Sequence, residues 1–137
     1  MIVITKDFKD KKVAVIGLGI EGSSVVRFLQ DKDAQITIFD RKKESELDFK
    51  GIDKSKIKTV CGEKYLSRGF KEFDIIFRSQ GVKRNLLQIL EAEEVGVEIS
   101  SEIKLFFDLS PSKIIGVTGT KGKGTTSTLI SNIYYRD

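Results

Sequence analysis

The chain has 137 residues, of which 39% are hydrophobic and 32% charged, and its formal net charge is +4. These values are typical of a soluble globular protein with one complete domain and exclude a disordered chain, because roughly 100 to 150 residues is the commonest domain size. With no histidine and a single cysteine, the chain cannot build a Ser-His-Asp triad, a Cys-His pair, a histidine-ligated zinc site or an internal disulfide.

The composition also limits where in the cell the protein is expected and what it is expected to bind. The longest apolar stretch, Val13 to Ile20, is far shorter than the roughly 20 residues that span a bilayer, and the start MIVITKDFKD lacks a signal-peptide pattern. We therefore expect a cytoplasmic protein with no membrane contact. Basic residues are scattered among 20 acidic ones, which predicts a solvated surface rather than a nucleic-acid interface, with some attraction for small polyanions. Cys61 is expected to be a buried strand residue.

Apolar runs alternate with helical patterns along the first 110 residues. The pattern predicts strands at 12–16, 35–40, 58–61, 73–78 and 97–99, helices at 21–30 and 86–94, and a short helix that ends near 107. Gly96 is placed to end the second helix, and Ser100 or Ser101 to cap the third. In the first helix, the side chains expected to face inward are Val25, Val26, Phe28 and Leu29. Alternating strands and helices indicate an α/β fold with a parallel, Rossmann-like sheet and right-handed crossovers.

A domain boundary is expected near residue 110. Pro111 and its serine neighbours are typical of a linker. Residues 1–110 then form a Rossmann-like domain, and residues 111–137 begin a second unit with a strand at 113–117, a glycine-rich loop and a helix. A nucleoside-triphosphate fold needs more strands after such a loop, so the chain is expected to be the front end of a longer protein.

The first glycine-rich loop is GLGIEG, directly after the first strand. In this GxGxxG pattern Gly17 permits a tight turn, Gly19 a close backbone approach, and Gly22 the packing of helix on strand. Asp40 ends the second strand, where a carboxylate can accept hydrogen bonds from a ribose or a base. The pattern predicts a nucleotide site and leaves open whether the ligand is a dinucleotide or a UDP-sugar.

The second loop, in GVTGTKGKGTTST, follows a short apolar run. Its glycines allow peptide N–H groups and a helix start to point at phosphate oxygens. Lys123 would reach the terminal phosphates, and a hydroxyl of Thr125 or Thr126 would meet Mg2+. The spelling departs from the general Walker form because Gly124 stands where a Ser or Thr is usual.

Five segments together resemble the amino-terminal part of the Mur ligase family, most closely its D-glutamate-adding members. They are GLGIEG, IFDRK, RSQGV, EISSEIKLFF and VTGTKGKGTT, in that order and spacing, and the similarity covers nearly all of the chain. The family pattern has proline where Gln80 stands, asparagine where Lys121 stands, and Ser or Thr at Gly124. Folylpolyglutamate synthases share the Gly124 spelling, but they begin with the ATPase domain.

The resemblance implies three domains: a Rossmann-like one for the UDP part of the substrate, a central ATPase and a C-terminal domain. It implies that the family uses ATP and Mg2+ to activate the carboxylate of UDP-N-acetylmuramoyl-L-alanine as an acyl phosphate, which D-glutamate attacks, in peptidoglycan precursor synthesis. The residues it implies for the UDP-substrate are Gly17, Leu18, Gly19, Ile20, Glu21, Gly22, Asp40, Arg41, Lys42, Ser79 and Gly81. Those it implies for ATP are Gly119, Thr120, Lys121, Gly122, Lys123, Gly124, Thr125 and Thr126, with Lys123 catalytic and Thr125 or Thr126 on the metal.

Two other hypotheses remain. The first is a non-catalytic NAD-binding regulatory module, motivated by the first loop and Asp40; the second is a folylpolyglutamate-type or other amide ligase, motivated by Gly124. The truncated central domain implies that this chain, a predicted monomer, binds nucleotide without catalysing ligation.

Overall fold

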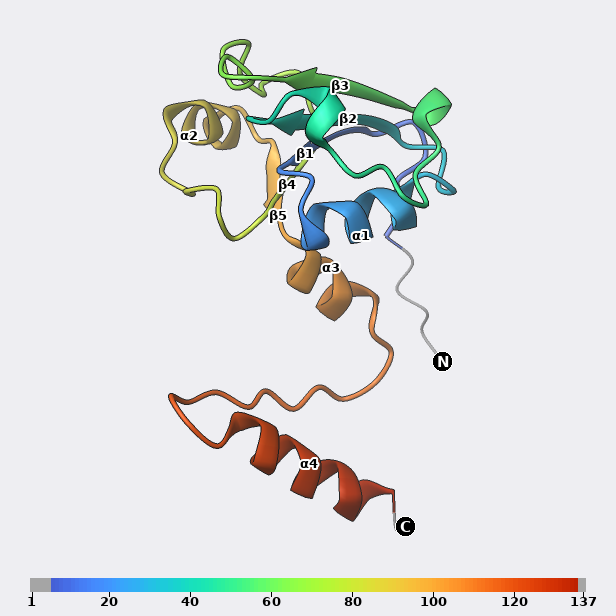
Figure 1. Ribbon diagram of the computed structural model, residues 1–137, viewed down its shortest axis with the longest axis vertical. Helices are drawn as coiled ribbons and strands as arrows, with labels where there is room; N and C mark the ends of the chain where they lie inside the picture. Colours follow the sequence, from blue (N-terminus) through green and yellow to red (C-terminus); the bar gives the residue numbers. More distant parts are fainter. Residues whose placement is uncertain (1–5, 136–137) are drawn as a thin grey trace.

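A computed structural model of the chain describes residues 6–135. Five strands form one sheet in the order β3-β2-β1-β4-β5, and every pairing is parallel (Figure 1). The elements are β1 (Lys12–Ile16), α1 (Ile20–Leu29), β2 (Gln35–Asp40), two 3-10 turns (Glu44–Glu46 and Lys54–Lys56), β3 (Ile57–Cys61), β4 (Ile75–Arg78), α2 (Leu87–Glu94), β5 (Glu98–Ser100), α3 (Glu102–Leu109) and α4 (Lys123–Tyr134).

The sheet confirms the predicted Rossmann-like α/β fold. The central strand, β1, pairs with β2 on one side and with β4 on the other. From β1 the chain adds β2 and β3 on one side of the sheet and then β4 and β5 on the other. The strand order therefore reverses at β1, and such a switch point leaves a crevice at the carboxyl ends of the strands. The predicted elements of this domain are present, with ends displaced by one or two residues.

Apolar side chains cover both faces of the sheet. On one face, α1 and α3 bury Val25, Val26 and Leu105 against alternate residues of β1, β2 and β4. On the other face, α2 buries Ile89 and Ala92 within a second apolar cluster, to which the 62–73 segment also contributes. Helices on both faces are what a parallel sheet requires, because its strands are apolar on both sides.

One inward-facing prediction for α1 was wrong. Val25, Val26 and Leu29 are buried as expected, but 36% of Phe28 is exposed. Its ring packs edge to face against Phe8, with centroids 6.3 Å apart. The spacing of apolar residues in the helix could not show that Phe28 lies at the border of the core, because the residue that packs on it, Phe8, comes from outside the helix.

Two predicted helix signals are confirmed. The Ser101 hydroxyl accepts a hydrogen bond from the Lys104 backbone N–H at 3.2 Å, which identifies Ser101 rather than Ser100 as the cap of α3. Gly96 follows α2 with a φ of +90°, a left-handed conformation that glycine adopts without strain.

The strand predicted at 113–117 is wrong: these residues form no strand, and Ile114 and Ile115 are 40% and 47% exposed. A strand needs a hydrogen-bonded neighbour, and no strand within residues 6–135 pairs with this segment. The segment runs extended to α4, which stands apart from the sheet and has no buried residue (Figure 1). The glycine loop and the helix of the predicted second unit are therefore present without a sheet beneath them.

Within residues 6–135, no helix is both long and apolar enough to cross a bilayer. The first residues of the chain, on which the signal-peptide expectation rests, lie outside the described residues, as do the last two residues of the predicted second unit.

Candidate functional site at the carboxyl edge of the sheet

Three of the predicted segments meet at the carboxyl edge of the sheet. The GLGIEG loop follows β1, Asp40 ends β2, and Ser79 follows β4. Because β2 and β4 are the two neighbours of β1, the glycine loop lies between Asp40 on one side and Ser79 on the other. The structure thus brings together residues that are far apart in the sequence, at the switch point of the sheet.

The three glycines of the loop differ in what they do. Gly17 has a φ of +89°, as a tight turn requires. A Cβ atom on Gly22 would lie 1.9 Å from the Gly17 carbonyl oxygen, so α1 approaches β1 more closely than any side chain allows. Around Gly19 no atom lies within 4 Å of an added Cβ. That open space above the loop is what a ligand backbone contact would need.

Asp40 connects the first loop to the segment after β2. Its Oδ2 accepts the Leu18 N–H and its Oδ1 accepts the Lys42 N–H, each at 2.8 Å. Each carboxylate oxygen can accept more than one hydrogen bond, so the carboxylate can hold the loop and still receive a ligand hydroxyl or N–H. Arg41 and Lys42 are exposed beside it.

The turn after β4 is attached to the glycine loop by contacts that the sequence did not predict. The Ser79 hydroxyl donates to the Ile16 carbonyl at 3.0 Å, and the Gln80 N–H donates to Oε2 of Glu21 at 3.1 Å. The Arg78 guanidinium donates to the Val82 carbonyl and closes the turn. No spacing signal in the sequence links these partners, because they come from different crossovers.

The loop has the features of an anion site. The N-cap residue that precedes α1, Gly19, makes no side-chain hydrogen bond to the helix, so N–H groups of the first turn are left without a side-chain cap. These groups and the helix dipole favour a negative charge there. Ile20 is 88% exposed next to them, and Gly81 is open on the opposite side. The arrangement can bind a phosphate and place an apolar side chain against the rest of a ligand.

The second glycine loop has a backbone suited to phosphate but lies away from the sheet (Figure 1). Gly119 and Gly122 have φ values of 151° and 78°, and Gly122 begins α4 without a side-chain cap. The Lys123 ammonium donates to the Gly119 carbonyl at 2.6 Å, which folds its side chain over the loop. The remaining predicted residues of this loop, all exposed, are Thr120, Lys121 and Gly124.

The two threonines predicted for Mg2+, Thr125 and Thr126, differ from the hydroxyl residues that follow them on α4. The hydroxyls of Ser127 and Thr128 donate to backbone carbonyls one turn earlier. Within residues 6–135 those of Thr125 and Thr126 make no such bond and are free to bind a metal. The same residues contain no cluster of three acidic or cysteine side chains that could hold a metal ion.

Cys61, which ends β3, is half-buried and has no disulfide partner. Burial, together with the negative charges of Glu44 and Asp40, raises the pKa of its thiol. Because a raised pKa leaves less thiolate near neutral pH, we expect iodoacetamide at about pH 8 to alkylate Cys61 at least about threefold more slowly in the folded protein than in concentrated urea. Mass spectrometry measures both rates, with N-acetylcysteine as a control for the effect of urea. Equal corrected rates would contradict the expectation.

Two comparisons with known proteins agree on one family. Residues 11–101 match the family described as Mur ligase MurD-like, N-terminal domain. The chain is 44% identical over 133 residues to a UDP-N-acetylmuramoylalanine–D-glutamate ligase of Acetivibrio thermocellus, with 93% of this chain and 28% of that protein covered. The corresponding ligase of Clostridium acetobutylicum is 40% identical, with the same two coverages. The chain thus spans less than a third of the length of these relatives.

A solved structure of shikimate dehydrogenase from Aquifex aeolicus is also similar, at 14% identity and a TM-score of 0.47, over 89% of this chain and 55% of that one. Such a similarity is too weak to assign a function.

Proposed function

Because the chain belongs to the Mur ligase family through a MurD-like N-terminal domain, we propose that it is the amino-terminal part of a ligase that adds D-glutamate to UDP-N-acetylmuramoyl-L-alanine in peptidoglycan precursor synthesis. The observation that supports this most is the meeting of the glycine loop, Asp40 and Ser79 at one edge of the sheet. In this proposal the domain of residues 1–110 binds the UDP-substrate.

The substrate diphosphate lies over the first glycine loop. Gly17 to Gly22 supply N–H groups and room for close approach, as the open space at Gly19 allows. Asp40 accepts hydrogen bonds from the uracil or ribose while it holds Leu18. The exposed Arg41 or Lys42 adds a positive charge beside the nucleotide, and Ser79 and Gly81 line the other side.

ATP and Mg2+ belong to the second loop in this proposal. When bound, ATP supplies the phosphoryl group that activates the substrate carboxylate for attack by the amine of D-glutamate. Gly119 to Gly124 hold phosphates through backbone N–H groups, and Lys123 offsets their charge. The hydroxyl of Thr125 or Thr126 meets the metal.

The 137-residue chain alone does not catalyse ligation in this proposal. The second loop lies on an exposed segment with no sheet beside it, and ligation requires both loops and the incoming amine in one closed site. We further propose that the chain is monomeric and cytoplasmic, and that it contacts neither nucleic acid nor membrane.

Calorimetric titration of the chain with UDP-N-acetylmuramoyl-L-alanine tests the proposal, with NADH as the rival ligand because a GxGxxG loop and a strand-end acid also suit a dinucleotide. We expect saturable binding of the UDP compound alone. Binding of NADH alone would instead identify a regulatory dinucleotide module. An assay for phosphate release from ATP, with all substrates present, completes the test, and turnover by this chain would contradict the non-catalytic assignment.

A further inference from the structure

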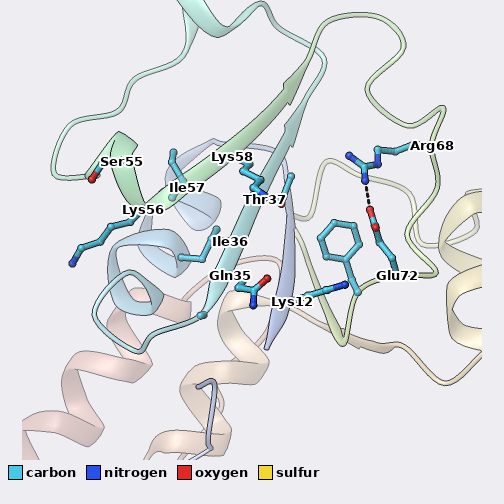
Figure 2. Close-up of a pocket in the computed structure, with 12 residues that line it drawn as sticks. Lys12, Gln35, Ile36, Thr37, Ser55, Lys56, Ile57, Lys58, Arg68 and Glu72 are labelled. Carbon is cyan, nitrogen blue, oxygen red and sulfur yellow. Dashed lines mark hydrogen bonds and ion pairs between the residues drawn. The ribbon is translucent and has the colours of Figure 1, made fainter. Parts of the chain in front are cut away.

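A depression of about 400 Å³ lies at the other end of the strands from the glycine loop (Figure 2). It opens on the sheet surface where β1, β2 and β3 begin. Its volume falls within the roughly 300–1,000 Å³ of small-molecule sites. The residues that line it are Lys12, Ala34, Gln35, Ile36, Thr37, Ser55, Lys56, Ile57, Lys58, Arg68, Glu72 and Phe73.

The depression exists because this face of the sheet is only partly covered. Side chains alternate along a strand, so Lys12 shares a face with Ala14 and Ile16, which are buried in the cluster beneath α2. The register pairs Lys12 with Gln35, and Thr37 with Lys58. Helix α2 packs near β5 at the opposite side of the sheet, so the starts of β2 and β3 remain open (Figure 1).

The floor of the depression is apolar and its rim is basic. Phe73 is buried in the apolar cluster of this face, and Thr37, 9% exposed, adds a hydroxyl to the same face, whereas the side chain of Ile36 belongs to the apolar cluster on the opposite face of the sheet. Figure 2 shows the Arg68–Glu72 pair at one side of the depression and Ser55 and Lys56 at the other. An apolar floor with a few polar groups converging above it is the usual composition of a ligand site.

Four basic side chains and one carboxylate line the depression. Arg68 is paired with Glu72, and Lys56 lies 3.4 Å from the Asp31 carboxylate. Lys12 and Lys58 form no ion pair within residues 6–135, and the Asp74 carboxylate accepts the backbone N–H of Lys12 instead. Among the described residues, two ammonium groups without an ion-pair partner therefore line one cavity from β1 and β3, the two strands on either side of β2.

From this geometry we propose that the depression is a second binding site, separate from the glycine loop, for a small molecule that carries two or more phosphate or carboxylate groups. One exposed ion pair contributes little to binding. A multivalent anion can engage Lys12 and Lys58 together, with the Thr37 hydroxyl and the Gln35 amide as donors between them. The net positive lining favours such an anion over a neutral ligand.

The test is an NMR titration of the 15N-labelled chain with inorganic diphosphate and, separately, with citrate, at constant ionic strength. We expect saturable shifts of the amides of Lys12, Thr37 and Lys58. The double variant K12Q/K58Q is expected to weaken this binding about tenfold, since it removes two charge contacts of up to about 1 kcal/mol each. The control K64Q/K113Q removes the same charge from two exposed lysines away from the depression and should change the affinity less than about twofold.

The two anions distinguish the sources of the charge. Binding of diphosphate alone would indicate a phosphorylated ligand, and binding of citrate alone would indicate a polycarboxylate. Binding of both would indicate that the site selects its ligand by charge. Each of these three results supports the site. Diphosphate shifts at Gly19 and Glu21 report the glycine loop and are read separately. Shifts confined to that loop, shifts that rise without saturation, or equal losses in both double variants would overturn the proposal and assign the two lysines to the solvated surface of the sheet.

Discussion

The substitution Gly22→Ala is expected to destabilise the sheet domain by at least about 2 kcal/mol. Alanine is ordinarily favoured over glycine in a helix by up to about 1 kcal/mol, but here its Cβ would lie 1.9 Å from the Gly17 carbonyl oxygen and 3.4 Å from a Val15 methyl group. Backbone cannot yield as a flexible side chain can, so α1 must move away from β1. The clash therefore outweighs the gain in helix propensity.

Thermal and urea unfolding measure this effect. A loss of 1 kcal/mol lowers Tm by about 4–8 °C in a domain of 60–100 residues, so we expect a fall of roughly 10 °C or more. The matched control is Gly19→Ala, which meets no atom within 4 Å and has an ordinary φ of −85°. It should keep its Tm and weaken binding of the UDP compound. Equal Tm values for the two variants would show that α1 does not require glycine at the crossing.

Asp40→Ala is the second substitution with a large expected effect. The carboxylate accepts the N–H groups of Leu18 and Lys42, and the bond to Leu18 is partly buried and joins the end of β2 to the loop after β1, across one crossover. Leaving a buried donor unsatisfied costs about 1–3 kcal/mol. We expect that loss of stability in urea unfolding, together with loss of calorimetric binding of the UDP compound, because the loop is no longer held at β2.

Asp48→Ala is the control for Asp40→Ala. Asp48 also accepts a backbone N–H two residues along, that of Lys50 at 2.9 Å, but it is exposed and holds no second segment. Its replacement should change stability by no more than about 0.5 kcal/mol. If the two aspartates give the same loss, the long-range contact to Leu18 contributes nothing measurable.

The sequence predicted the sheet domain well because its signals are local. Strand and helix patterns repeat within ten residues, and Gly96 and Ser101 mark their ends through their own backbone geometry. The strand at 113–117 failed because a strand is defined by a partner, and residues 113–117 have none beside them. Phe28 was misplaced for a related reason, since Phe8, which packs on it, comes from a distant segment.

The sequence predicted which residues lie together at this edge of the sheet but not the hydrogen bonds that connect them, and the binding of a nucleotide there stays a prediction. The GxGxxG spacing and the strand-end acid identified Gly17 to Gly22 and Asp40, because the topology of a parallel sheet brings such positions to one edge. The bond from Gln80 to Glu21 and that from Ser79 to Ile16 join different crossovers. Only the three-dimensional register of β1 and β4 places those partners together.

The isolation of α4 has a consequence for the second loop. A helix of 12 residues with no buried side chain depends on local hydrogen bonds, and isolated helices of about this length are only marginally stable in water. The loop and helix start that we propose to bind phosphate then adopt this arrangement for only part of the time. Because apparent affinity falls in proportion to the competent fraction, this loop would bind nucleotide more weakly here than where packing keeps α4 helical.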